Sequence, residues 1–465
     1  MKNGGNMNKK ELLSYLENIT DEVNNMSLEI WNNPEVSGEE ERAANLYRSV
    51  LKEKGFKIVE VAGMEHAFYA EYGNGYPVIA LLGEYDALPG LSQAVDTKFN
   101  PIEKDGPGHA CGHNMLGAAP FGAALAIKEY IDKTGTNGTI RFYGCPDEER
   151  LVGKGKMIKA GAFEGCDLAL SWHPMAVNSA LNEAFLAMNT MKFKFHGISA
   201  HAAQSPESGR SALDAVELMN TGANYMREHI IDKARVHYTI TNAGGAPNIV
   251  PAEAESWYYV RAPKMKDVED ITERLYDIAR GAALMTGTTV EIEKLGGCYE
   301  MLPNDVLFEL TYKNMDEADL PTYTEKELKY SKDLQDTLDS KLVALEKDKY
   351  LGDSDSDVVI YEGLVDKEDI GKVVVAGSSD SGDVSWNMPM NLFITSTWPL
   401  GVPNHSWQAT SGAGSTIGSK GMMYASSIFT GMLYDILNDN SIVEEAREEF
   451  NKRTKNNKYV SPFED

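Results

Sequence analysis

Apolar positions along the first 180 residues recur at spacings that predict helices and strands in alternation. From Leu12 to Ile30 they recur every three or four positions, which predicts one amphipathic helix that ends near Asn33 and Pro34. A second helix is expected over about 39–54. Further elements are expected as strands at 76–82, 139–143 and 167–172 and as helices after Asn114 and near 155–159. Strands joined by helical crossovers predict an α/β fold with a mostly parallel sheet, covered by helices on both faces.

The pattern changes near residue 183, where a second group of elements begins. Its strands and helices are expected at 188–195, 213–230, 237–241, 256–261 and 267–285. The order strand, helix, strand, strand, helix, strand is that of a small α+β sandwich of ferredoxin-like type. We therefore expect residues 187–298 to form an inserted domain, and residues 1–186 and 299–465 to form one discontinuous domain. Two domains also suit a chain of 465 residues.

Net charge and the start of the chain restrict the partners and the compartment. A formal net charge of −26 argues against nucleic acids and anionic membranes, because contacts with phosphate groups need a basic patch. A small-molecule substrate is favoured instead. The polar start, Met1 to Lys10, lacks the apolar segment of a secretory signal, so we expect a cytoplasmic protein. Cysteines are too few and too scattered for a disulfide framework: Cys111, Cys145, Cys166 and Cys298.

A thiol and two imidazoles lie within the seven residues Gly108 to Asn114, directly before an apolar run that predicts a helix. Cys111 and His113 are two positions apart, so in an extended conformation their side chains would point to the same side and could bind one cation or two. Thiolate and imidazole suit zinc, whereas carboxylates also admit manganese. The alternative interpretation is a glycine-rich turn with a capping histidine and a buried thiol.

Acidic and imidazole side chains follow three later strands. Glu148 and Glu149 come after the strand at 139–143, at the carboxyl edge where open α/β sheets gather ligands. Glu149 is expected to bind metal, and Glu148 to act as general base beside it. His173 follows the strand at 167–172, and His405 comes after a strand expected at 391–397. They complete a predicted set of five ligands: Cys111, His113, Glu149, His173 and His405. Such a set suits two cations about 3.5 to 4 Å apart.

Six segments together resemble the M20 family of metallopeptidases and amidohydrolases, and most closely its subfamily D. They are GHACGHN, PDEE, SWHP, GISAHAAQSPESGRSALDA, GGAPNIVPAEAESWYYVRA and PNHSW. The resemblance implies that the discontinuous domain is catalytic, that the same five residues bind two divalent metal ions, Mn²⁺ or Zn²⁺, and that Glu148 is the general base. One strand ends in Gly83-Glu84-Tyr85-Asp86, without the histidine of the wider family, which leaves Asp86 in doubt as a ligand.

The resemblance also assigns roles within the inserted domain. It implies that this domain forms a dimer, and that His201, at the head of its first helix, reaches the partner's active site and polarises the scissile carbonyl. Asn248 and Arg261 match positions that hold substrate, and a guanidinium can bind a substrate carboxylate through two hydrogen bonds. The alternative for Arg261 is an exposed strand arginine that pairs with one of the many acidic residues, and the substrate-binding role is favoured. Four residues near the motifs receive no role: His109, Arg210, Asp380 and Asp383.

The expected reaction is hydrolysis of the amide bond of an N-acyl or aminobenzoyl amino acid, such as aminobenzoyl-glutamate, by metal-activated water. A dipeptidase or a general N-acyl-amino-acid hydrolase would use the same site. A non-catalytic metal-binding scaffold is an alternative of another class, but it would have no use for Glu148. The expected assembly is a homodimer through the inserted domain, or a partnership with a related second subunit.

Overall fold

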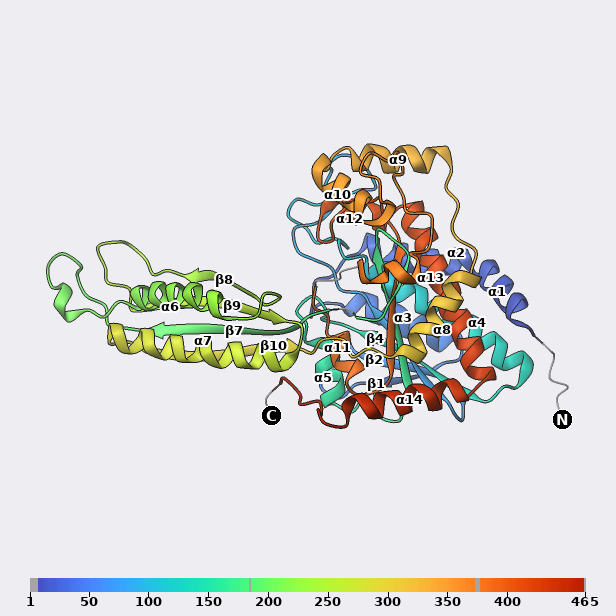
Figure 1. Ribbon diagram of the computed structural model, residues 1–465, viewed down its shortest axis with the longest axis horizontal. Coiled ribbons are helices and arrows are strands. Elements are labelled where there is room, and N and C mark those ends of the chain that lie inside the picture. The colour runs from blue at the N-terminus through green and yellow to red at the C-terminus, as the bar shows by residue number, and fades with distance from the viewer. Residues whose placement is uncertain (1–6, 184, 373–376, 464–465) are drawn as a thin grey trace. The chain divides into compact units, whose positions relative to one another are not determined.

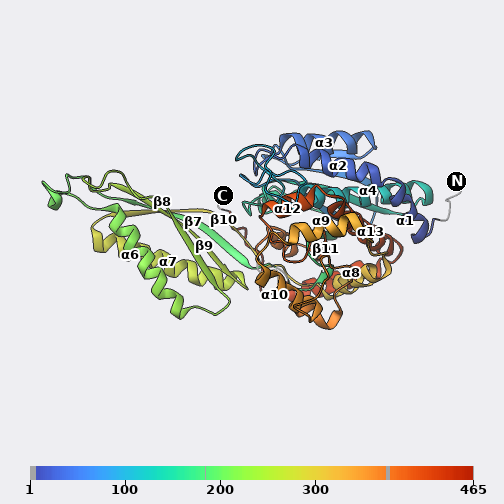
Figure 2. The same ribbon diagram turned by 90° about the horizontal axis from the view of Figure 1, so that it is seen from above.

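The computed structural model describes residues 7–183, 185–372 and 377–463, and these divide into two compact units. The first unit comprises residues 7–183, 302–372 and 384–459, and the second comprises 185–301, 377–383 and 460–463 (Figures 1 and 2). The second unit therefore includes two short segments that lie far along the chain from 187–298. None of the described helices combines the length and the apolar character needed to cross a membrane.

A seven-stranded sheet in the order β1-β2-β4-β3-β5-β11-β6 forms the centre of the first unit. Its strands are β1 Lys57–Glu60, β2 Phe68–Asn74, β3 Val78–Glu84, β4 Gly138–Cys145, β5 Leu168–Met175, β6 Ser179–Leu181 and β11 Met390–Ser396. The four central strands β4, β3, β5 and β11 are parallel, while β1, β2 and β6 are antiparallel at the edges. The prediction of a mostly parallel α/β sheet is confirmed for its centre. The antiparallel strands at the edges were not predicted. Strands β1 and β2 carry several polar residues, and β6 is only three residues long.

Helices cover both faces of this sheet. One face packs against α3 (Glu41–Glu53), α4 (His113–Thr134), α8 (Asp305–Glu317) and α13 (Thr416–Asn438). The other face packs against α5 (Gly153–Lys159), whose Met157 joins a cluster of buried apolar side chains from β3, β4 and β5. The remaining helices with residues in this unit are α1 Lys9–Asn18, α2 Thr20–Asn32, α9 Glu325–Gln335, α10 Ser340–Leu351, α11 Ser381–Ser385, α12 Trp407–Ala413 and α14 Ser441–Thr454. Because β4, β3, β5 and β11 are parallel, their carboxyl ends share one edge of the sheet, and the candidate ligands lie at that edge.

The prediction of one helix from Leu12 to Ile30 is wrong, because the chain forms two helices there. Helix α1 ends and α2 begins at Ile19, whose backbone is not helical (φ −103°, ψ 11°). The acidic residues Asp21 and Glu22 lie in the first turn of α2, where the helix dipole favours negative charge. The apolar spacing gave no sign of the break, because both helices pack against α4.

The second unit is an antiparallel sheet in the order β10-β7-β9-β8 with two helices. Its elements are β7 Ala187–His196, α6 Ala212–Met226, β8 Arg235–Asn242, β9 Glu253–Ala262, α7 Met265–Thr286 and β10 Thr289–Cys298. Alternate residues of β9 are buried, as expected for a sheet with helices on one face only. The order of elements is the one that the sequence predicts for an α+β sandwich.

Candidate active site

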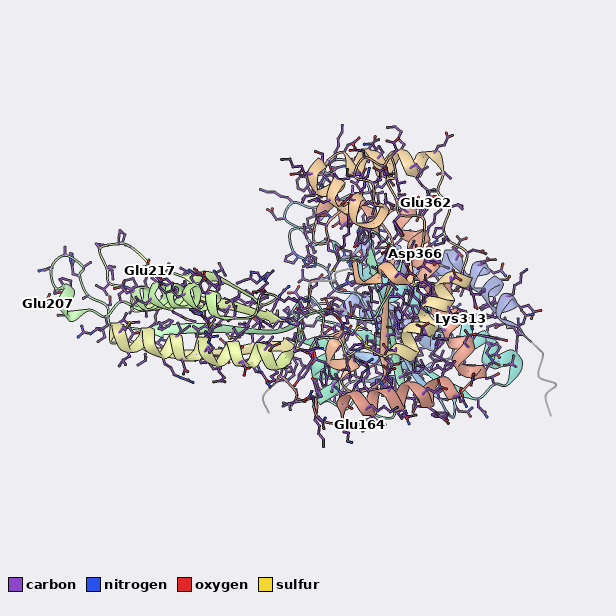
Figure 3. The ribbon with its side chains drawn as sticks, in the orientation of Figure 1. Glu164, Glu207, Glu217, Lys313, Glu362 and Asp366 are labelled. Carbon is purple, nitrogen blue, oxygen red and sulfur yellow. The ribbon has the colours of Figure 1, made fainter. Side chains whose placement is uncertain are left out.

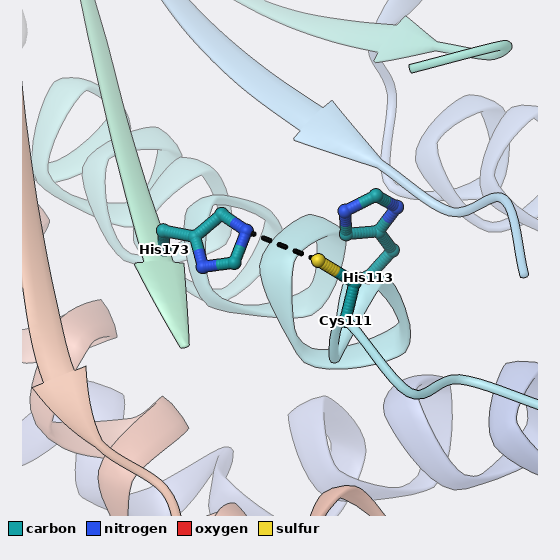
Figure 4. Close-up of side chains that lie close together, drawn as sticks. All are labelled: Cys111, His113 and His173. Carbon is teal, nitrogen blue, oxygen red and sulfur yellow. Dashed lines mark hydrogen bonds between the residues drawn. The ribbon is translucent and has the colours of Figure 1, made fainter. Parts of the chain in front are cut away.

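The segment that carries Cys111 and His113 forms a turn, and not the extended conformation in which both side chains would point to the same side. Gly112 has φ 74°, in the left-handed region, and it is the N-cap of α4, whose first residue is His113. A Cβ atom at Gly112 would lie 2.9 Å from Cγ of Pro174. Glycine thus allows both the backbone conformation and the close approach to β5. Figure 4 shows the thiol and the two imidazoles close together despite the turn.

His173 presents a neutral ring nitrogen to the thiol. Its Nε2 lies 3.4 Å from Sγ of Cys111, and its Nδ1 donates a hydrogen bond to the carbonyl oxygen of Pro174 at 2.8 Å (Figure 4). Because a carbonyl oxygen only accepts hydrogen bonds, the proton is on Nδ1 and the lone pair of Nε2 faces Cys111. Burial, together with the neighbouring His113, lowers the pKa of His173 to about 4 and keeps the ring neutral.

His113 is fully buried and surrounded by carboxylates. Its Nδ1 lies 2.8 Å from Oδ1 of Asp86. Its Nε2 lies 3.4 Å from Glu84, 3.8 Å from Glu148 and 4.0 Å from Glu149. Among the described residues this Nε2 has no hydrogen-bond partner, an arrangement typical of a nitrogen that binds metal. Asp86 therefore lies where it can orient the ring of His113 through Nδ1. This position differs from that of a direct metal ligand, the role left in doubt by the sequence.

Two buried carboxylates hold the loop that carries Glu148. The Glu40 carboxylate accepts a hydrogen bond from the backbone N–H of Asp147 at 2.8 Å, and Asp86 accepts one from the N–H of Glu149 at 2.9 Å. Asp147 has φ 68°, so its backbone needs such support. Burial, with the nearby charge of Asp86, raises the pKa of Glu40 to about 7. Sequence analysis missed Glu40, because it lies in the run 39–41 of three glutamates, which is typical of a solvated helix start.

His405 lies in the loop after β11, and its side chain approaches Glu149. Its Nε2 lies 3.4 Å from Oε2 of Glu149, and its backbone N–H donates to the carbonyl oxygen of Ala110 at 3.0 Å. The second bond ties this loop to the one that carries Cys111. Three overlapping groups have ligand atoms within 4.8 Å of one another: Cys111 with His113 and His173, Cys111 with Glu149 and His405, and Glu84 with His113 and Glu148. All five predicted ligands and Glu148 thus converge within the first unit.

These separations fit a metal centre. Ligand atoms about 2.1 Å from a cation lie roughly 3.0 to 3.5 Å apart in octahedral or tetrahedral geometry, and three pairs here lie at 3.4 Å. Burial, and next the Glu149 charge, raises the pKa of the Cys111 thiol well above its usual range. A bound cation would reverse that effect, because coordination deprotonates a thiol.

His201 does not begin a helix, so that expectation is wrong. It lies in a loop, where its Nδ1 accepts a hydrogen bond from the backbone N–H of Gln204 at 3.2 Å. Helix α6 begins only at Ala212, with the hydroxyl of Ser211 as its cap. The carbonyl oxygen of Asn248 accepts from the N–H of the residue that follows His201, so the two predicted residues lie on adjoining loops. Glu207, labelled in Figure 3, lies in the His201 loop and marks that end of the second unit.

Arg261 lies in β9, near the end of this strand that is farther from the loops of His201 and Asn248. It lies eight positions after the first residue of this strand, Glu253, a distance of about 26 Å at the usual rise per residue. The guanidinium lies 5.8 Å from the ring of Tyr259, and its Nε is buried with no hydrogen-bond partner within the described parts of the chain. One chain therefore does not bring Arg261 together with His201 and Asn248.

Two of the four residues without a predicted role make hydrogen bonds away from the ligand cluster, and the other two are buried. Nε2 of His109 lies 3.2 Å from the carbonyl oxygen of Ile30, and Arg210 donates to the carbonyl oxygen of Gly209 in its own loop. Asp380 and Asp383 are fully buried in the second unit. Sequence analysis also missed Lys154, which is fully buried with its Nζ 2.6 Å from Oε1 of Glu84. Lys154 lies in no motif, and the segment that contains Glu84 drew attention only to its missing histidine and to Asp86.

Known proteins resemble this chain over most of its length. The model of peptidase family M20/M25/M40 matches residues 80–333. The chain is 41% identical over 450 residues to the B-type subunit of the p-aminobenzoyl-glutamate hydrolase of Escherichia coli, covering 94% of this chain and 93% of that protein. It is 32% identical over 313 residues to the Xaa-Arg dipeptidase of Mus musculus, covering 64% of this chain and 69% of that protein.

A solved structure shares the fold. It is a dinuclear metal-binding peptidase of the M20 family from Bacillus subtilis, with a TM-score of 0.59 and 18% sequence identity over 91% of this chain and 99% of that one. The family model covers more than half of this chain, and the bacterial relative is similar over nearly all of it. The chain belongs to peptidase family M20/M25/M40 and is a hydrolase that acts on amide bonds.

Proposed function

We propose that this protein is a metal-dependent amidohydrolase that releases an amino acid from an N-acyl or aminobenzoyl amino acid, with an aminobenzoyl-glutamate-like substrate as the first candidate. One observation carries the proposal: the five predicted ligands and Glu148 gather around a buried imidazole nitrogen that has no hydrogen-bond partner among the described residues. The similarity to a component of an aminobenzoyl-glutamate hydrolase supports the choice of substrate. The similarity to a dipeptidase supports a dipeptide as the second candidate.

The donor set fits two divalent cations, Mn²⁺ or Zn²⁺, held by Cys111, His113, Glu149, His173 and His405. Such a pair supplies a water of lowered pKa and polarises the substrate carbonyl. Glu148 is the general base: its carboxylate takes a proton from the attacking water and later gives it to the leaving amine. The hydrogen bonds of Glu40 and Asp86 on either side of it fix the loop for this role. Cytoplasmic location agrees with the absence of a disulfide bond among the four cysteines, all of which lie in the described residues.

A complete site needs a second copy of the chain in this proposal. Arg261 lies at one end of β9, whereas His201 and Asn248 lie on loops at its other end. If Arg261 binds the substrate carboxylate, the His201 that polarises the scissile carbonyl comes from a partner. We therefore propose a homodimer through the second unit. A related second subunit is the alternative, since the bacterial relative is itself named as a subunit.

Glu148→Gln should lower kcat by about 100-fold or more, because the amide cannot take a proton from water. The measurement is hydrolysis of aminobenzoyl-glutamate, acyl-aspartates and dipeptides by protein loaded with Mn²⁺ or Zn²⁺, with chelated protein as the blank. Glu164→Gln, at an exposed position, is the matched control. A Glu148→Gln variant that hydrolyses the substrates at the wild-type rate would remove Glu148 from the mechanism. A wild-type protein that hydrolyses none of the three substrate classes with either metal would favour the scaffold interpretation.

Mixing two inactive variants tests the shared site. His201→Ala and Glu148→Gln should each be nearly inactive as homodimers, since each lacks one group needed at every site. In mixed dimers one of the two sites has both groups intact, so random exchange of subunits should restore about a quarter of the wild-type rate. Absence of recovery in mixtures shown by native mass spectrometry to contain heterodimers would mean that His201 does not act in the partner's site.

Arg261→Ala should raise KM for carboxylate-bearing substrates about 10- to 100-fold, because a charge-assisted hydrogen bond contributes about 1.5 to 3 kcal/mol. Arg235→Ala is the control, since Arg235 pairs with Arg261 across the strands but already donates to the carbonyl oxygen of Asp232. KM is measured for each substrate and for its carboxamide analogue. A KM that is unchanged by Arg261→Ala would exclude Arg261 from the substrate site.

A further inference from the structure

Glu84 and Lys154 form an ion pair that neither the predicted ligand set nor the proposed mechanism uses. Glu84 is the last residue of β3, and Lys154 lies in the first turn of α5. Nζ of Lys154 lies 2.6 Å from Oε1 of Glu84, and the side chains are 0% and 2% exposed. Removing two charges from water is so unfavourable that a buried ion pair is weak evidence for added stability. A pair beside the candidate metal centre therefore points to a function.

The second oxygen of Glu84 faces the candidate metal site. Oε2 lies 3.4 Å from Nε2 of His113, while Nδ1 of the same ring lies 2.8 Å from Asp86. Asp86 accepts a hydrogen bond from Nδ1 of His113, and Nε2 of the same ring faces the Glu84 oxygen across 3.4 Å. A positive charge is favoured between these two atoms, and a bound divalent cation would take the place of a proton there. A cation about 2.1 Å from each atom would subtend an angle of roughly 108° between them, close to tetrahedral.

We infer that Glu84 is a further ligand in the metal centre, binding the same cation as His113 through Oε2, while the buried Lys154 holds Oε1. This inference rests on the metal site of the proposed function and adds a residue to it. The group of Glu84, His113 and Glu148 contains only carboxylate and imidazole donors, whereas the two groups around Cys111 contain a thiolate. The Glu84 side of the centre therefore suits a hard divalent cation such as Mn²⁺ better than the Cys111 side does.

The test is metal binding, measured without substrate. Metal-free full-length protein is titrated with Mn²⁺ by isothermal calorimetry, and the bound metal is counted by mass spectrometry after gel filtration. Wild type should bind two equivalents. Glu84→Gln should bind one, or bind the second with an affinity lowered by about 10- to 100-fold or more. Glu71→Gln is the matched control, because Glu71 also pairs with a basic side chain, Arg141, on a neighbouring strand.

Folding is controlled with the double variant Glu84→Gln/Lys154→Met, which removes both buried charges and should show the same loss of Mn²⁺. Two equivalents bound with wild-type affinity by either folded variant would overturn the inference and leave the Glu84–Lys154 pair as a structural ion pair. Wild-type protein that binds no metal would overturn both the inference and the proposed function. Loss of one Mn²⁺ from the variants, with a wild type that hydrolyses no amide, would support the inference and contradict the proposed function alone.

Discussion

The candidate active site depends on one electrostatic constraint: carboxylates, imidazoles and a thiol gather at the carboxyl edge of the sheet, and most of them are buried. His113 has carboxylates on both sides, and its Nε2 has no hydrogen-bond partner in the part of the chain that the structure describes. Buried charges need counter-charges. Divalent cations would satisfy the thiol, the imidazoles and the carboxylates at once, so we regard the metal as part of what holds this edge together.

The fold meets that constraint by ending several strands at one place. Parallel strands β3, β4, β5 and β11 bring Glu84, the Glu148 loop, His173 and the His405 loop to the same edge, and α4 begins there with His113. Hydrogen bonds to the backbone then fix the positions of the loops. Glu40 and Asp86 accept hydrogen bonds from the loop after β4, and the Ala110 carbonyl oxygen accepts one from the loop after β11. The ligands are far apart in sequence, but each is fixed by backbone hydrogen bonds or by a second polar contact.

Much of this arrangement could be predicted from the sequence, because strand and helix spacing is a local property. The spacing predicted the order of the main elements in both units, and the strand ends indicated where Glu148, His173 and His405 would lie. Contacts that depend on tertiary structure could not be predicted in this way. The break at Ile19 is hidden because both helices bury their apolar residues against the same neighbour. The turn at Gly112 and the loop position of His201 depend on backbone conformations that spacing does not encode. Glutamate and lysine are usually exposed at protein surfaces. Only the fold shows that Glu40, Glu84 and Lys154 are buried.

The central claim is that these side chains surround a pair of cations, and anomalous X-ray diffraction from crystals grown with Mn²⁺ tests it most directly. The account predicts two anomalous peaks about 3.5 to 4 Å apart. One should lie within bonding distance of Cys111, and the other within bonding distance of Nε2 of His113. Anomalous peaks found only elsewhere on the protein, with ordered Cys111, His113 and His405 side chains and no peak between them, would contradict it.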